Sequence, residues 1–126
     1  MVESSTEMAE VPARVAWLQQ ATCFKVLPEE VLVAIATKLT PRSLQANRRL
    51  VLEDTHPDAL YILKTGHLER YRTQRTTMAQ TVDLLPGVIL HLREILLDQP
   101  TDYTVITLED SELWQLSAEL LSHFST

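Results

Sequence analysis

The hydrophobic period of the sequence changes twice, and this change constrains the fold more than any other feature. Up to Pro41 the apolar residues recur at the spacing of amphipathic helices. After Pro41 they fall in short β-prone runs, which are separated by turn-forming clusters such as residues 54–58 and 98–102. Residues 111–124 return to helical spacing. This order predicts a mainly β domain with flanking helices, in which an antiparallel sandwich or barrel lies between helices at both ends.

The β-prone runs are short and carry several aromatic and β-branched residues. They cover residues 43–45, 48–53, 59–74, 80–85, 88–90 and 103–109. We expect Leu60, Ile62, Leu84 and Val105 to face the core. Left-handed turns usually require glycine, and Asn and Asp tolerate this conformation best after it. We therefore expect Asn47 and Asp54 to hold two such turns.

Two helices are predicted before the strands. Pro12 suits the first turn of a helix over residues 11–24, whose apolar face includes Val15, Leu18 and Thr22. Pro28, followed by two glutamates, marks the start of a second helix over residues 27–40. Its apolar stripe consists of Val31, Leu32, Ile35, Ala36 and Leu39. We expect residues 1–10 to form a flexible acidic N-terminus and residues 11–126 to form one domain.

The predicted final helix carries an apolar stripe. It consists of Trp114, Leu116, Leu120, Leu121 and Phe124. Such a stripe usually packs on its own domain, and less often forms a partner surface. Because the chain stops soon after this stripe, we expect a monomer or a weak homodimer.

Composition excludes several classes of protein. The chain has 126 residues, which suits one domain, and it lacks the run of about 18 apolar residues that would cross a membrane. Its N-terminus is acidic and does not resemble a secretory signal. Cys23 is the only cysteine, so no internal disulfide can form, and we expect it to be a small core residue. These features favour a cytoplasmic protein without a membrane partner.

Charge is unevenly distributed along the chain. The formal net charge is −6, yet residues 42–75 carry seven basic and four acidic residues, and residues 76–126 carry one basic and eight acidic residues. The basic residues alternate with apolar ones at strand spacing, which is typical of the solvated faces of strands. We therefore expect no nucleic-acid partner.

Motifs for catalysis or metal binding are missing from the sequence. With only two glycines the chain has no glycine-rich phosphate loop, and its four histidines are scattered. His91 with Glu94 comes nearest to the metal-ligand pattern of a cupin, but a second histidine is lacking. We predict that the chain is not an enzyme and holds no cofactor or metal, and that each histidine lies in a turn or on the surface.

One combination of motifs resembles the cyclic nucleotide-binding domain. It consists of residues 60–63 (LYIL), Gly66, the pair Pro86–Gly87, residues 95–100 (ILLDQP) and residues 103–116 (YTVITLEDSELWQL). The resemblance extends over most of the chain, from about Leu18 to Phe124. It implies an antiparallel β-roll, or jelly roll, of eight strands, with N-terminal helices and a short C-terminal helix. A short helix between two strands would hold the cyclic phosphate, and family members regulate transcription, kinases and channels.

The residues that contact the ligand in this family are replaced. After Pro-Gly the family pattern continues with Phe-Gly-Glu and ends with Pro-Arg-Ser/Thr-Ala. An alignment without gaps puts His91 at the glycine, Leu92 at the glutamate and Thr101 at the arginine, while Tyr103 takes the alanine position. The glycine opens the backbone to the phosphate, the glutamate accepts from a ribose hydroxyl and the arginine neutralises the phosphate. Leu92 and Thr101 supply neither charge.

A second alignment puts Arg93 at the glycine and Glu94 at the glutamate. It restores a ribose acceptor but shortens the distance to Pro100, and no arginine follows that proline. Arg93 and Glu94 are therefore the possible ligand contacts if binding is retained. We favour Arg93 as an exposed helix residue that pairs with Asp98 or Glu94 over a ligand contact. Asp102 has no obvious partner in the local sequence other than Arg93.

Two functions remain open at this point. The chain could be a regulatory or protein-interaction module that has lost cyclic nucleotide binding and acts through another protein or an attached output domain. It could instead be a small-molecule sensor for a cyclic nucleotide or a less anionic ligand. Since a hydrogen bond to a charged group contributes about 1.5–3 kcal/mol, loss of two such contacts favours the first function.

Overall fold

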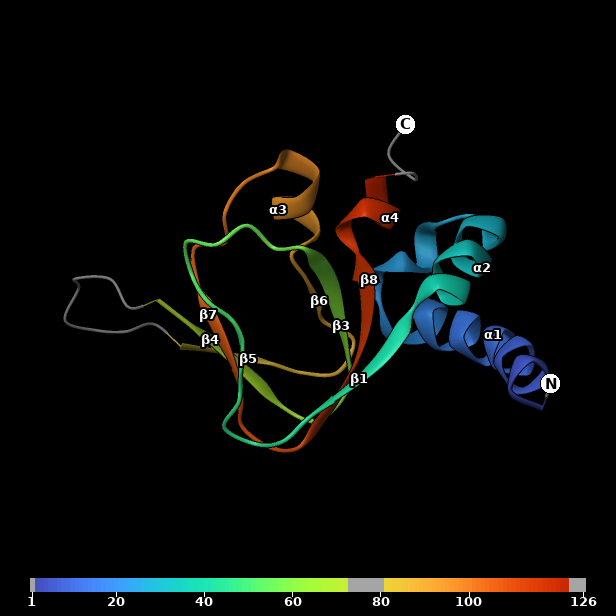
Figure 1. Ribbon diagram of the computed structural model, residues 1–126, viewed down its shortest axis with the longest axis horizontal. Helices are drawn as coiled ribbons and strands as arrows, with labels where there is room; N and C mark the ends of the chain where they lie inside the picture. Colours follow the sequence, from blue (N-terminus) through green and yellow to red (C-terminus); the bar gives the residue numbers. More distant parts are fainter. Residues whose placement is uncertain (1, 73–80, 123–126) are drawn as a thin grey trace. The chain divides into compact units, whose positions relative to one another are not determined.

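The computed structural model describes residues 2–72 and 81–122, with side chains for residues 10–72 and 81–120. The described chain divides into two compact units at the boundary between Leu39 and Thr40. The first unit is helical and the second contains every described strand (Figure 1). The predicted fold class, an antiparallel β-roll with flanking helices, is confirmed.

The first unit contains α1 (Val2–Ala21), the 3-10 helix η1 (Cys23–Val26) and α2 (Glu29–Lys38). The Arg14 guanidinium on α1 donates to the carbonyl oxygens of Ala36 (3.0 Å) and Leu39 (3.2 Å), so that it satisfies carbonyls at the C-terminal end of α2. The predicted apolar faces are confirmed except at Val31, which is half-buried. The other members, Val15, Leu18, Thr22, Leu32, Ile35, Ala36 and Leu39, are buried.

Two expectations for this unit need correction. The backbone of α1 is already helical from Val2, so the helix starts well before residue 11, although the flexibility of residues 1–10 stays a prediction. Cys23 is exposed and is not a core residue. It follows the helix-ending Thr22, whose hydroxyl donates to the Leu18 carbonyl (2.6 Å) and accepts from the Phe24 amide (3.1 Å).

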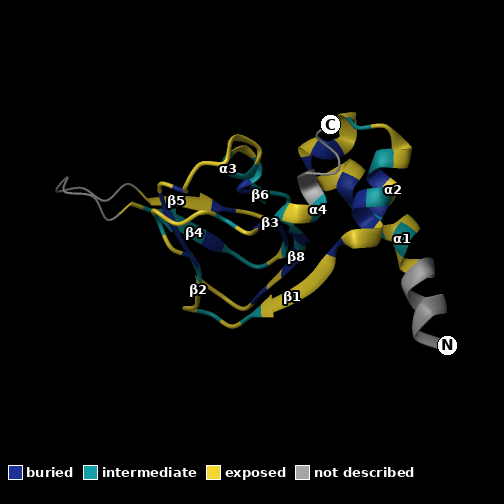
Figure 2. Ribbon diagram, turned by 45° about the horizontal axis from the view of Figure 1, so that its top comes forward, coloured by how far each residue is buried: buried dark blue, intermediate teal, exposed yellow. Residues whose placement is uncertain are grey.

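The second unit contains two four-stranded antiparallel sheets. One has the order β1 (Thr40–Leu44), β8 (Ser111–Ser117), β3 (Ala59–Thr65) and β6 (Ile89–Leu90). The other has the order β2 (Arg49–Val51), β7 (Thr104–Thr107), β4 (Leu68–Tyr71) and β5 (Thr81–Leu84). The short helices α3 (Leu92–Leu97) and α4 (Ala118–Ser122) follow β6 and β8. The outer strands β1 and β5 are largely exposed, whereas β3 and β8 are largely buried (Figure 2).

The core of the roll is an apolar cluster to which both sheets contribute. Its buried members are Val51, Ala59, Tyr61, Leu63, Leu68, Leu84, Leu90, Tyr103, Val105 and Leu113. Leu60 and Ile62 are fully buried as predicted. Because side chains alternate along a strand, however, they lie on the opposite face of β3 from Tyr61 and Leu63. Leu84 and Val105 are buried as well, so the prediction that these four residues face the core is confirmed.

The predicted final helix is wrong in its first half. Residues 111–117 form β8, a strand that pairs with both β1 and β3, so Trp114 and Leu116 lie in a sheet. Only Ala118–Ser122 is helical, and Leu120 is half-buried there. The side chain of Leu121 and all of Phe124 lie outside the described residues, so the apolar stripe is not a single helix face.

Two left-handed turns are confirmed. Asn47 has φ 64° and Asp54 has φ 67°, the conformation expected for both residues. The Asn47 amide donates to the Thr107 carbonyl (2.8 Å) and the Asp54 amide donates to the Thr101 carbonyl (2.7 Å). These bonds hold the turns on either side of β2 against the segment that contains β7.

Candidate functional site

The candidate site is built around α3, the short helix that follows β6. Both of its ends carry left-handed residues, His91 with φ 76° at the start and Asp98 with φ 52° at the end. The Gln99 amide donates to the Glu94 carbonyl (2.8 Å) and closes the last turn. Left-handed backbone conformations therefore fix both ends of α3.

His91 is buried and packs among aromatic rings. Only 2% of its surface is exposed, so the prediction that it lies in a turn or on the surface is wrong as regards its exposure. Its ring is stacked with that of Tyr103, with centroids 6.0 Å apart and planes inclined by 24°. The Tyr61 ring meets it edge-on, also at 6.0 Å. The three rings form one aromatic cluster inside the roll, which we call the ring cluster.

The electrostatic environment of His91 favours the neutral ring. Burial lowers the pKa of His91 below its ordinary value of 6.5, and Glu94, the backbone of Ala59 and Asp58 oppose this shift in part. Although Ala59 lies near, neither ring nitrogen makes a hydrogen bond of ordinary geometry. A buried polar group without a partner costs stability, and such groups are rare in folded proteins. His91 is therefore the least satisfied buried side chain of the site.

Thr101 is completely buried and held by its backbone. Its amide donates to the Thr55 carbonyl (2.9 Å), and its carbonyl accepts from the Asp54 amide (2.7 Å). Its hydroxyl lies 3.2 Å from the Tyr103 carbonyl and 3.4 Å from the Tyr103 amide. This position carries no charge and has no exposed surface.

The residues at the start of α3 differ in exposure. Leu92 and Glu94 are half-buried, and Arg93 is exposed. In the part of the chain that the structure describes, Arg93 makes no ion pair with Glu94 or Asp98. The sequence alternative in which Arg93 stands at the glycine position would have it adopt a left-handed backbone, but that conformation occurs at His91.

Two arginines, Arg70 on β4 and Arg72 just after it, contribute to the site and were not predicted as site residues. Arg70 lies with its guanidinium carbon 5.1 Å from the centroid of the Tyr103 ring, and Arg72 forms an ion pair of 2.6 Å with Asp102. Asp102 therefore has a partner that is 30 residues away in sequence. Burial raises the pKa of the Tyr103 phenol, Glu94 adds to this shift and Arg70 opposes it. The alternation of arginines at positions 70 and 72 was the only signal in the sequence.

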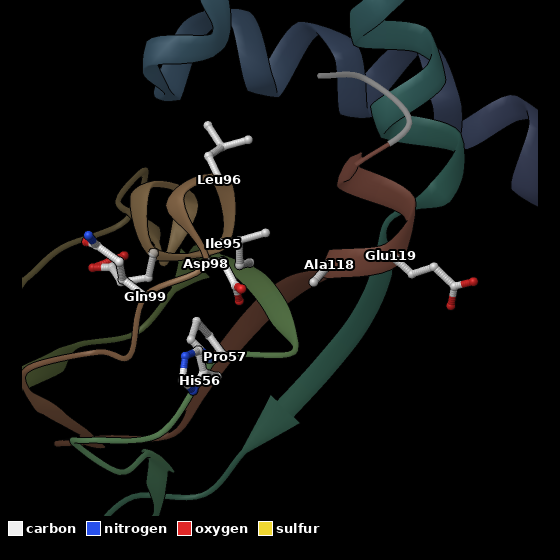
Figure 3. Close-up of a pocket in the computed structure, with 9 residues that line it drawn as sticks. His56, Pro57, Ile95, Leu96, Asp98, Gln99, Ala118 and Glu119 are labelled. Atoms are coloured by element: carbon white, nitrogen blue, oxygen red, sulfur yellow. The ribbon is translucent and has the colours of Figure 1, made fainter. Parts of the chain in front are cut away.

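A cavity of about 380 Å³ lies beside α3 (Figure 3). It is lined by His56, Pro57, Glu94, Ile95, Leu96, Asp98, Gln99, Ala118 and Glu119. Three of these side chains are carboxylates, and neither His91 nor Tyr103 is part of the lining. The cavity therefore presents acidic groups on one side of α3, while the ring cluster lies in the core of the roll.

The described residues lack both a cluster of metal ligands and a membrane span. They contain no group of three or more His, Cys, Asp or Glu side chains that could hold a metal ion. No helix among them combines the length and the apolar character that crossing a membrane requires.

Several solved structures share this fold. The regulatory domain of Toxoplasma gondii PKA with cAMP aligns with a TM-score of 0.81 and 21% identity, over 91% of this chain and 44% of that chain. The regulatory subunit of a cAMP-independent protein kinase A from Trypanosoma cruzi, bound to guanosine, aligns with a TM-score of 0.83 and 13% identity, over 94% of this chain and 42% of that chain. The catabolite activator protein of Thermus thermophilus aligns with a TM-score of 0.69 and 24% identity, over 79% of this chain and 47% of that chain.

This chain therefore spans less than half of each of these three solved chains. No curated protein matches its sequence significantly. The sequence model described as "Cyclic nucleotide-binding domain" matches residues 41–125, which include β1 from Pro41 onward, β2 to β8, α3 and α4. Since this match covers most of the chain and agrees with the β-roll, the chain belongs to the cyclic nucleotide-binding domain family.

Proposed function

We propose that this chain is a regulatory or protein-interaction module that has lost high-affinity binding of cyclic nucleotides. The observation that carries this proposal is the stack of Tyr103 on His91 inside the roll. The alignment without gaps puts these two side chains at the glycine and alanine positions of the family's phosphate-binding cassette, the segment that runs from Phe-Gly-Glu to Pro-Arg-Ser/Thr-Ala. Two rings thus fill space that smaller residues would leave to a ligand.

The left-handed backbone at His91 supports that alignment. A glycine adopts φ near 76° without strain, whereas a β-carbon makes this conformation unfavourable. The strain is consistent with a backbone that keeps the shape of a glycine-containing cassette after the glycine itself is replaced. Under this alignment Leu92 and Thr101 stand where the family carries a carboxylate and a guanidinium.

Charge leads to the same conclusion. Thr101 is fully buried and neutral, and the neighbouring Asp102 carboxylate is paired with Arg72, so neither residue supplies the missing cation. Loss of two charge-assisted contacts, at about 1.5–3 kcal/mol each, would turn a micromolar site into one that is roughly millimolar or weaker. The exposed Arg93 and the half-buried Glu94 are the remaining candidate contacts on α3.

A second candidate function is the sensing of an uncharged or weakly anionic small molecule. The two unpartnered nitrogens of His91 favour it, because a ligand that entered the roll could satisfy them. The Trypanosoma cruzi relative has the same fold, and it is described as cAMP-independent and bound to guanosine, a nucleoside. A nucleoside needs no cation at Thr101.

The remaining parts of the proposal concern context. We propose that the module acts without catalysis and without a cofactor, in the cytoplasm, as a monomer or weak homodimer. Its partner would be another protein or an attached output domain. The solved relatives are more than twice as long as the segment they share with this chain, which supports an output carried elsewhere.

A titration panel separates the two functions. Amide chemical shifts of the ¹⁵N-labelled chain would be followed during addition of cyclic AMP, cyclic GMP and guanosine. The proposed module shows no saturable shifts with any of them below about millimolar concentration. Saturable shifts at His91 and Tyr103 with guanosine alone would establish the second function, and micromolar binding of either cyclic nucleotide would contradict the loss of the site.

A further inference from the structure

A small cavity lies on β4, next to the ring cluster but separate from the cavity beside α3. Its volume is about 90 Å³, and Arg70, Tyr71, Arg72, Val82 and Tyr103 line it. This volume is about three times the roughly 30 Å³ that one water molecule occupies in the liquid. The cavity can thus hold a small polyatomic group.

Two guanidinium groups lie at this cavity. Arg70 pairs with Val105 of β7, a member of the core cluster, so Arg70 is on the inner face. Arg72 follows the last residue of β4, and its guanidinium reaches the Asp102 carboxylate. Both arginines line the cavity together with the ring of Tyr103.

The charge at this cavity is not balanced. Arg72 is paired with Asp102 at 2.6 Å, and both side chains are more than half exposed. Arg70 lies over the Tyr103 ring and makes no ion pair with a carboxylate in the described residues. The segment 73–80 (TQRTTMAQ) contains no acidic residue that could serve as its partner. Arg70, Arg72 and Asp102 together carry a net charge of +1, and Glu94 is a further carboxylate within electrostatic range of Tyr103.

The Tyr103 hydroxyl adds a third potential donor. Its pKa is raised by burial, so the phenol stays protonated at neutral pH. Two guanidinium forks and a phenol offer more donors than the two oxygens of a carboxylate can accept, whereas a phosphate monoester presents three terminal oxygens and up to two negative charges. From this geometry we infer that the cavity of Arg70, Arg72 and Tyr103 binds the phosphoryl group of a phosphate monoester.

This inference does not rest on the proposed function. A cyclic nucleotide carries a phosphodiester with one negative charge and only two terminal oxygens, so it is a poor match for three donors. The arginine that the family places at Thr101 is also on a different element from Arg70. Failure of phosphate binding would therefore leave the loss of cyclic nucleotide binding untouched, and the reverse also holds.

The direct test is a titration of the ¹⁵N-labelled full chain with inorganic phosphate, in which the arginine Nε–Hε signals are observed. Ionic strength is kept constant with chloride, and acetate is titrated in parallel. We expect saturable shifts of the Arg70 and Arg72 signals with phosphate, with a dissociation constant on the order of millimolar because the site is partly open to solvent. Equal shifts with chloride, or tighter binding of acetate, would overturn the inference.

Variants of the cavity should change the affinity for phosphate in both directions. Arg70→Gln should weaken phosphate binding roughly tenfold or more, and Tyr103→Phe should weaken it several-fold while keeping the ring. Asp102→Asn should strengthen it, because Arg72 is then released and a repulsive charge is removed. Arg48→Gln is the matched control, since this exposed arginine lies in the turn before β2, and it should leave the affinity unchanged.

Two results would contradict the assignment of these residues. One is an Arg70→Gln variant that binds phosphate as tightly as Arg48→Gln does. The other is an Asp102→Asn variant that binds more weakly than the unmodified chain. Because Asp102 is exposed, its substitution leaves the fold intact, and the second comparison stands even if Arg70→Gln is unstable.

Two further probes would identify the source of the phosphoryl group. Free O-phosphoserine represents a small metabolite, and a blocked phosphoserine tripeptide represents a phosphorylated protein. Tighter binding of either probe than of inorganic phosphate supports the site and identifies the source. Weaker binding of both probes would overturn the assignment to a monoester.

Discussion

The imidazole ring of His91 stacks on the phenol ring of Tyr103 at a centroid distance of 6.0 Å, and this contact joins the start of α3 to the residue before β7. Both rings are more than 90% buried. The two elements that frame the cassette of a cyclic nucleotide-binding domain are thus held together by side chains of the protein itself. This contact has consequences for stability, for pH dependence and for ligand binding.

Replacement of Tyr103 should reveal how much the ring cluster stabilises the fold. Tyr103→Ala removes a buried ring and should lower the free energy of unfolding by about 3 kcal/mol or more, as is typical for loss of a core aromatic residue. Tyr103→Phe keeps the ring and should cost less than about 1 kcal/mol. Urea unfolding followed by circular dichroism measures both changes. Equal losses in the two variants would show that the hydroxyl, and not the ring, matters for stability.

The lowered pKa of His91 predicts a pH dependence with a definite sign. Because the unfolded chain takes up a proton near pH 6.5 and the folded chain does so only at lower pH, the unfolded state binds more protons between these two values. Stability should therefore be unaffected by His91 above pH 6.5 and should decrease as the pH falls below it. Urea unfolding at a series of pH values between about 5 and 8 measures this slope.

His56 provides the matched control for this slope, because it is an exposed histidine. His91→Asn should reduce the slope below pH 6.5, since Asn does not titrate and tolerates a left-handed backbone. His56→Gln removes one exposed imidazole and serves as the comparison. If both variants retain the slope of the unmodified chain, His91 is not the group responsible.

Introduction of a cation at Thr101 should destabilise the present fold. Thr101→Arg forces a long charged side chain into a position with no exposed surface, and an unpaired buried charge costs about 3–5 kcal/mol. Adding Tyr103→Ala opens space next to it. The double variant should therefore be more stable than the sum of the two separate losses predicts, by a coupling energy of about 1 kcal/mol or more. Strict additivity in urea unfolding would show that the two side chains do not compete for the same space.

Gly66 tests the turn between β3 and β4. It has φ 110°, and a β-carbon at this position would collide with the side chain of Ser111. Ser111 is itself fixed, because its hydroxyl donates to the Glu109 carbonyl (2.8 Å). Gly66→Ala should therefore lower the free energy of unfolding by about 1–3 kcal/mol, which thermal or urea unfolding would measure. Ser111→Gly in the same chain should recover only part of this loss, because the backbone strain remains.

Much of the fold could be predicted from the sequence because its signals are local. The two helical faces in residues 11–40 and the left-handed turns at Asn47 and Asp54 follow from spacing and from residue type, and the structure agrees with them. β8 was misassigned because residues 111–117 contain glutamate and leucine, which favour helices. In the fold this segment lies between β1 and β3, and pairing on both sides overrides local propensity.

The candidate site was only partly predictable. The assignment of positions 91, 92, 101 and 103 to the cassette comes from a family pattern and stays a prediction. Burial of His91 depends on Tyr61 of β3 and on Tyr103, which are distant from one another in sequence. The pair of Arg72 and Asp102 spans 30 residues, and the register between β4 and β7 determines it. No local pattern encodes such a pairing, so the role of β4 became visible only in the folded chain.

The central claim concerns the four positions of the cassette. His91→Gly would relieve the left-handed strain, Leu92→Glu would supply a ribose acceptor, Thr101→Arg would supply a phosphate cation, and Tyr103→Ala would make room. Each single change should fail to create binding, because charge, open backbone and space are all needed together. The combined variant should bind cyclic AMP measurably if it folds, as circular dichroism would establish.

Calorimetric titration of the unmodified full chain with cyclic AMP tests this claim most directly, with the combined variant measured alongside. The account predicts no saturable heat for the unmodified chain up to about millimolar cyclic AMP, and measurable binding by the combined variant. A dissociation constant near micromolar for the unmodified chain would contradict the account.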